Sequence, residues 1–183
     1  MILKYFPLTD LVCSETSSGV IQSLVLVLGG SSGKENTHSV ITGLKSECKK
    51  LCSFLVKSVF EGATITASTE EAEEDTSQQQ QLLDGEAACR LLETLVIVSA
   101  KQFPKMYRKI SDKIFGGKVL NFATHPVANY PLQKLIANCP DKELVWKNLI
   151  VANNYENELN IVTGVYSLWW QGVAATTLII LRA

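Results

Sequence analysis

The sequence predicts an all-α fold, an α-α superhelix (solenoid) of helical repeats. Apolar residues recur at helical spacing through most of the chain, and we find no convincing alternating pattern of the kind that marks strands. A short motif also returns at intervals typical of helical repeats. The chain has 183 residues, of which 46% are apolar, which is enough for a few units of such an array.

The N-terminal part, residues 1–61, is expected to hold helical repeats that form a partial array. A first helical segment is predicted over residues 11–28, because its apolar side chains share one face and Gly29 and Gly30 end it. A second helix is predicted from Val40 to Phe60, with apolar residues on one stripe and lysines elsewhere.

Residues 62–81 are expected to form a flexible, acidic and glutamine-rich insertion, because large apolar residues are few there. The segment ends in a glutamine tract at residues 78–81, and its acidic residues are Glu70, Glu71, Glu73, Glu74 and Asp75. The whole chain has a formal net charge of −1, which argues against a uniformly basic nucleic-acid binder. Without these acids the remainder would carry about +4.

Helices are expected to resume in residues 82–167. The predicted helices cover residues 82–100, 105–115, 119–121, 128–138 and 142–151. Two β-branched clusters, residues 25–27 and 95–98, could be strands on their own, but they continue a helical stripe and are predicted to be buried helix. Residues 168–183 are expected to be an apolar tail. Because solenoids need polar terminal repeats, we expect missing flanking repeats or a truncated or aberrant end.

The most informative motif is Asn129-Tyr130-x-x-Gln133. Two amides at positions i and i+4 of a helix stand on one face and can present donors and acceptors to the edge of a flat polar partner. Tyr130 follows Asn129 directly, so its ring can lie over the face of that partner. A splayed-out RNA base is a ligand that offers both an edge and a face.

Similar segments occur elsewhere in the chain. Ser18 with Gln22 and Cys89-Arg90 with Glu93 have the same spacing, and a fainter copy begins at Thr163. The copies start 71, 40 and 34 residues apart. A period near 35 to 40 is typical of α-solenoids. The first interval fits either two units or one unit that the acidic insertion enlarges.

These copies resemble Pumilio-family (PUF) RNA-binding repeats, with Asn129-Tyr130-x-x-Gln133 the closest match. The surrounding residues 122–133, together with 18–22 and 163–165, are most similar to the divergent branch typified by nucleolar protein nine. The resemblance implies that the second helix of each repeat lines a concave face, where the first, second and fifth motif residues meet one base.

The resemblance also implies a set of RNA-binding residues and a cellular role. The implied RNA-binding residues are Asn129, Tyr130, Gln133, Cys89, Arg90, Glu93, Ser18 and Gln22. By family analogy, the copy at Asn129 favours uracil and the copy at Cys89 favours guanine. The expected partner is single-stranded or locally opened RNA, namely precursor ribosomal RNA of the small subunit in the nucleolus, with pre-ribosomal proteins as further partners.

Each motif copy also has a purely structural interpretation. The copy at Asn129 could be a solvated helix face, and the copy at Cys89 could combine a core thiol with an ordinary Arg–Glu helix pair. For Ser18, Gln22 and Thr163 the structural interpretation is favoured. The main rival for the whole chain is an armadillo- or HEAT-type scaffold for protein–protein interactions. A fragment of an enzyme whose catalytic part lies elsewhere is a weaker rival.

The residues give no sign of catalysis, so we expect no enzyme activity, no cofactor and no small-molecule substrate. The five cysteines are scattered and His38 and His125 are isolated, so no metal site is predicted and reduced thiols in an intracellular protein are expected. No apolar run is long enough to span a membrane. Residues 101–118 hold six Lys or Arg against one Asp, a patch that suits phosphate contacts or a solvated helix.

Overall fold

The computed structural model describes residues 8–30, 44–61, 63 and 82–139, and every regular element in these ranges is helical. The elements, in chain order, are α1 (Leu8–Cys13), α2 (Glu15–Leu28), α3 (Lys45–Leu55), η3 (Val56–Phe60), η4 (Leu82–Asp84), α4 (Glu86–Gln102), α5 (Pro104–Ile110), η5 (Ser111–Phe115), α6 (Val119–Thr124) and α7 (Asn129–Ala137). The fold is an all-α solenoid, as predicted.

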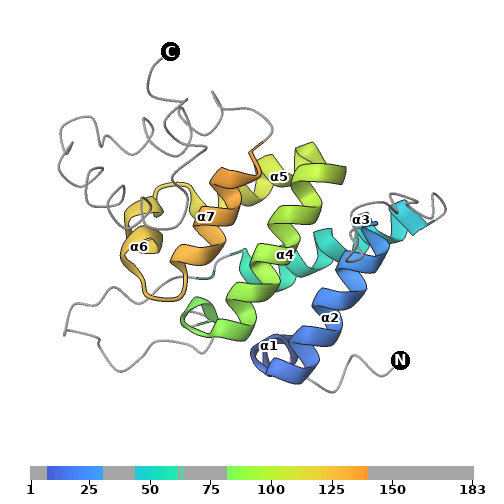
Figure 1. The fold of residues 1–183 in the computed structure, drawn as a ribbon, viewed down its shortest axis with the longest axis horizontal. Coiled ribbons are helices and arrows are strands. Elements are labelled where there is room, and N and C mark those ends of the chain that lie inside the picture. Colours follow the sequence, from blue (N-terminus) through green and yellow to red (C-terminus); the bar gives the residue numbers. More distant parts are fainter. Residues whose placement is uncertain (1–7, 31–43, 62, 64–81, 140–183) are drawn as a thin grey trace, which may run out of the picture.

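The three helices that carry the motif copies, α2, α4 and α7, form one row. Helix α4 lies in the middle and packs against α2 on one side and α7 on the other (Figure 1). Helix α3 runs behind α2 and α4, so the row forms the front layer of this view. We call α2, α4 and α7 the motif helices.

A repeat consists of a short helix, a motif helix and a longer third helix. Each motif helix follows a short helix, and the motif helices α2 and α4 are followed by a third helix. The short elements α1, η4 and α6 come first, the motif helices second, and α3–η3 and α5–η5 third. The motif copies at residues 18 and 89 therefore belong to consecutive repeats, because α2 and α4 are neighbours in the row. The structure thus decides that the interval of 71 residues is one enlarged unit rather than two.

The third helices repeat in sequence as well as in space. Both end in a π-helical turn that closes on a β-branched residue followed by phenylalanine, Val59-Phe60 in η3 and Ile114-Phe115 in η5, and all four side chains are buried. A glycine stands two residues after each phenylalanine. This second repeat signal was present in the sequence, but a search on the motif helices alone does not find it.

The core lies between the layers and is centred on α4. Ten residues of this helix are buried, including leucines on more than one side, because its neighbours in the row cover both flanks. Phe115 and Phe122 stack at a tilt of 42° with ring centres 4.5 Å apart, which joins η5 to α6. The buried Tyr107 hydroxyl donates to the Leu135 carbonyl, which joins α5 to α7.

Two contacts fix α2 along α4. Near its start, the Ser18 hydroxyl donates to the Ala87 carbonyl across the interface at 2.8 Å. At its end, Gly29 lies so close to Val98 that an added Cβ would come within 2.7 Å of a Val98 methyl. A side chain at position 29 would force the two helices apart.

Several predicted boundaries differ from the structure. The segment 11–28 is two helices, because Ser14 has an extended backbone (φ −77°, ψ 124°) and starts α2 as its N-cap residue. The helix predicted over 40–60 is described from position 45, and the one predicted over 119–121 extends to Thr124. The insertion apart from Ala63, the predicted helix over 142–151, Thr163 and the tail 168–183 lie outside the described residues.

Candidate RNA-binding surface

Helix α7 presents the motif Asn129-Tyr130-x-x-Gln133 at its first turn. Asn129 is the first residue of the helix, so Pro131 falls among the first four positions, where a backbone N–H has no helical partner. Proline is therefore accommodated without breaking the helix. Tyr130 is 54% exposed, which is unusual for a ring of this size in the described part of the chain.

The two amides of α7 form a fixed pair. Asn129 Nδ2 donates to the carbonyl oxygens of His125 (2.7 Å) and Pro126 (3.0 Å), so both of its hydrogens point to the preceding loop. Gln133 Nε2 donates to Asn129 Oδ1 at 2.9 Å. The Gln133 amide, which is half-buried, thus retains one N–H and its carbonyl oxygen for a ligand.

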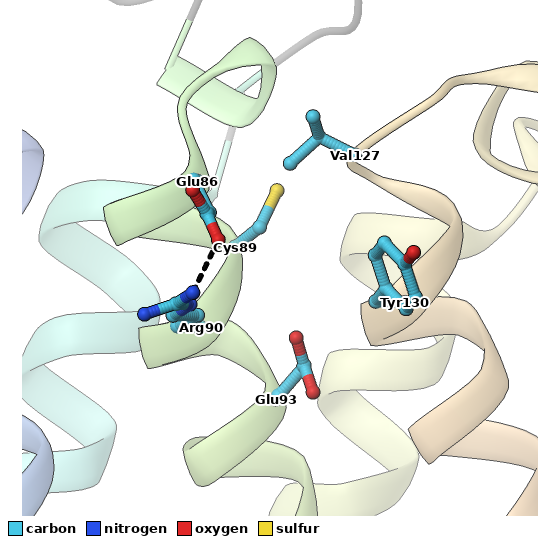
Figure 2. Close-up of a pocket in the computed structure, with 6 residues that line it drawn as sticks. All are labelled: Glu86, Cys89, Arg90, Glu93, Val127 and Tyr130. Atoms are coloured by element: carbon cyan, nitrogen blue, oxygen red, sulfur yellow. Dashed lines mark hydrogen bonds and ion pairs between the residues drawn. The ribbon is translucent and has the colours of Figure 1, made fainter.

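A shallow pocket lies between α4 and the start of α7 (Figure 2). Its volume is about 360 Å³, at the lower end for small-molecule sites. The lining residues are Glu86, Cys89, Arg90, Glu93, Val127 and Tyr130. The pocket therefore joins the whole motif copy of one repeat to the tyrosine of the next, a combination that neither copy provides alone.

The charged residues of the pocket are arranged by depth. Arg90 and Glu86 form an exposed ion pair one helical turn apart, which holds the guanidinium at the rim (Figure 2). Glu93 is half-buried, and this burial raises its pKa above the ordinary value, while the charges of Lys134 and Arg90 act in the opposite direction. Glu93 can accept two hydrogen bonds from a ligand when it is ionised.

Cys89 lies in the wall of the pocket and is almost completely buried. Its thiol donates to the Leu83 carbonyl at 3.1 Å, and burial, together with the charges of Glu93 and Asp84, raises its pKa to about 12. The thiol therefore stays protonated at neutral pH and is a poor nucleophile. Its available role toward a ligand is apolar contact.

Ser18 does not take the RNA-contacting position that the family resemblance implies. Its side chain is fully buried. Its hydroxyl donates to the Ala87 carbonyl and accepts a hydrogen bond from Gln22 Nε2 at 3.0 Å. These contacts hold α2 against α4 and leave Ser18 no surface for RNA. We therefore correct the sequence-based assignment: Ser18, with Gln22 as its partner, belongs to the interface between repeats.

The basic window 101–118 falls mainly on α5 and η5, which are not motif helices. Lys105, Arg108 and Lys113 are exposed there, whereas Lys109 pairs with Glu61 at 3.1 Å. Most of this positive charge is thus carried by the third helix of its repeat, away from the motif turns. Of its basic residues, Lys101 lies on a motif helix, in the last turn of α4.

Sequence reasoning missed Glu86 and Val127 as pocket residues. Glu86 lies one turn before Arg90, and this i, i+4 spacing was a detectable signal. Val127 lies in the loop before α7, and only the packing of consecutive repeats brings it to the pocket.

Other kinds of site were sought in the same part of the chain. Among residues 8–30, 44–61, 63 and 82–139, no group of three or more His, Cys, Asp or Glu side chains is placed to hold a metal ion. None of the helices described is long and apolar enough to cross a membrane.

A family model described as the NOP9-like PUF repeat domain matches residues 5–154, a range that contains every described element. The chain belongs to the NOP9-like PUF repeat family. It is a Pumilio-repeat RNA-binding protein, and a PUF repeat domain is a nucleic-acid-binding module rather than a catalytic one. No curated protein and no solved structure matched the chain.

Proposed function

We propose that this PUF-repeat chain binds single-stranded or locally opened RNA at the α4–α7 junction and seats a base in the pocket there. The observation that carries the proposal is the pocket itself, where Arg90 and Glu93 of one repeat meet Tyr130 of the next. A planar guanidinium and an aromatic ring both stack on base faces, and a carboxylate accepts from base N–H groups.

The two neighbouring motif copies then divide the recognition of bases between them. Glu93, as an acceptor, suits the imino and amino donors of guanine. The Gln133 amide, which keeps one donor and one acceptor, suits the edge of uracil, because this edge also offers both a donor and an acceptor. The proposed reading surface consists of the side chains Cys89, Arg90, Glu93, Asn129, Tyr130 and Gln133.

The natural RNA that we propose is the precursor of small-subunit ribosomal RNA, bound in the nucleolus during ribosome biogenesis. This proposal is supported by the family match, whose description names the NOP9-like branch. Pre-ribosomal proteins would be neighbours in such a particle. Crosslinking and sequencing of the RNA bound to the chain in cells would test it, with enrichment of pre-ribosomal RNA as the expected result.

The direct test is a titration of short RNAs containing U and G with the whole chain and with Tyr130→Ala. Loss of one stacked base is expected to weaken binding by about 5- to 150-fold, since stacking contributes roughly 1–3 kcal/mol per base. Phe54→Ala is the matched control, because Phe54 is an aromatic of similar exposure (50%) on α3, outside the pocket.

Binding should also weaken as the salt concentration rises, since phosphate contacts release counterions. Absent or salt-insensitive binding by the wild-type chain would contradict the proposal, as would equal affinities of Tyr130→Ala and Phe54→Ala. Binding of extended peptides at the same surface in place of RNA would favour a protein-interaction scaffold.

A further inference from the structure

His125 occupies the position four residues before Asn129, in the loop that precedes α7. Ser14 and Gly85 hold the equivalent positions before Ser18 and Cys89, and each is the N-cap residue of its helix. His125 is the bulkiest side chain of the three and has a titratable ring. Its side chain is only 11% exposed, so the ring is part of the packed structure.

The ring contacts two repeats at once. His125 Nδ1 accepts hydrogen bonds from the backbone N–H groups of Val127 (3.2 Å) and Ala128 (3.0 Å), the last residues before α7. The other ring nitrogen, Nε2, lies 3.3 Å from Asp84 Oδ1 in η4 of the preceding repeat. An imidazole that accepts at Nδ1 carries its proton on Nε2, which is the tautomer that faces a carboxylate favourably.

The backbone of His125 completes the arrangement, because its carbonyl oxygen accepts from Asn129 Nδ2 at 2.7 Å. The same residue therefore holds the start of α7, the amide of Asn129 and the edge of η4. Val127, whose N–H is bound to the ring, lines the pocket. His125 therefore contacts the start of one motif helix and the short helix that precedes the neighbouring one.

We propose that neutral His125 is a positioning residue of the reading surface, which fixes Asn129 and Tyr130 of one repeat against the Asp84 end of the preceding repeat. This inference rests on the proposed function, since its effect is read through RNA. It adds a residue outside the motif to the determinants of base selection. His125 itself contacts protein atoms rather than the base.

The contacts of the ring require an Nδ1 that carries no proton. A proton on Nδ1 would point a third donor at the two backbone N–H groups, so both hydrogen bonds would be lost. Asp84, in contrast, attracts the protonated ring. The charged or titratable groups of this junction, among the described residues, also include Glu86, Cys89, Arg90 and Glu93 on α4 and Tyr130 and Lys134 on α7.

The test measures base discrimination, which is the ratio of the affinities for two RNAs that differ at one nucleotide. This nucleotide is the one at which Gln133→Glu changes the preferred base. This ratio cancels the general attraction of an added positive charge for phosphate. We expect His125→Ala to reduce the discrimination about 2- to 30-fold, the range expected for loss of a helix cap.

His125→Asn is the rescue variant, since its side-chain oxygen can accept from the backbone N–H groups that follow it, as Nδ1 of His125 does. It should keep most of the discrimination that His125→Ala loses. Asn138→Ala is the matched control, because it removes a side-chain bond of 2.9 Å to the Lys134 carbonyl at the opposite end of α7. It should leave the discrimination unchanged.

The possible results separate this inference from the proposed function. If the wild type binds no RNA, or if Tyr130→Ala binds as the wild type does, the proposed function fails. If those tests succeed and His125→Ala keeps the full discrimination, only the role of His125 is refuted. If His125→Ala does not fold, the result for His125→Asn decides: a folded variant that loses the discrimination, although its side-chain oxygen can take the place of Nδ1, overturns the inference.

Discussion

The reassignment of Ser18 from RNA contact to repeat interface leads to a quantitative prediction. Replacing Ser18 by alanine removes a buried hydroxyl that bonds Ala87 at 2.8 Å and accepts from Gln22. A buried hydrogen bond contributes about 1 kcal/mol net, and an acceptor left unpaired adds to the loss. Ala87 lies in the first turn of α4, so its carbonyl also accepts a backbone hydrogen bond of the helix. This second bond limits the expected loss in the free energy of unfolding to about 1–2 kcal/mol.

Ser23→Ala is the control for this variant. Ser23 lies in the same helix, and its hydroxyl donates to the Gly19 carbonyl at 2.9 Å, but it is exposed. Both variants change helix propensity in the same way, so the difference between them isolates the bond that joins the repeats. Urea denaturation of both variants measures this difference as a shift in midpoint at constant m-value.

The same pair of variants tests the assignment of function. Ser18→Ala should bind RNA within about twofold of the wild type once both are fully folded, since less than about 0.4 kcal/mol of binding free energy is at stake. Two results would refute the reasoning: equal stability of Ser18→Ala and Ser23→Ala, or a selective loss of RNA affinity in Ser18→Ala. The second result would restore Ser18 as a base-contacting residue.

Two further predictions concern α7. Gln133→Glu removes the donor that bonds Asn129 Oδ1. The preference for uracil at one RNA position should therefore weaken by roughly tenfold in a competition assay. An unchanged preference would show that the amide pair does not read this base. Tyr107→Phe removes the buried hydroxyl that bonds Leu135 and should lower the free energy of unfolding by about 1–2 kcal/mol. Tyr130→Phe, which loses an exposed hydroxyl, should unfold like the wild type in the same experiment.

Much of the fold could be predicted from the sequence because its determinants are local. Helical spacing of apolar residues identified the class, and the helices predicted over 82–100 and 128–138 start four residues and one residue before α4 and α7. Pro131 was compatible with α7 only near its first turn, and the helix does begin at Asn129. The break at Ser14 was missed, since one extended residue does not interrupt an apolar stripe.

The candidate site was only partly predictable. The sequence identified Arg90, Glu93 and Tyr130, but it gave no reason to join residues of two motif copies in one pocket. For Ser18 the sequence favoured the structural interpretation, whereas for Cys89, at the same motif position, it left both interpretations open. Both side chains are buried, but Ser18 bonds across the interface to Ala87 whereas Cys89 lines the pocket.

The sequence by itself therefore determined the helical class, the repeating motif and the family resemblance, because these depend on spacing along one chain. The tertiary structure decided that the first 71-residue interval is one repeat, which motif residues face outward, and that His125 joins η4 to α7. These features depend on which helices become neighbours. Neighbours are set by the packing of whole side-chain surfaces, a property that no single segment of the sequence contains.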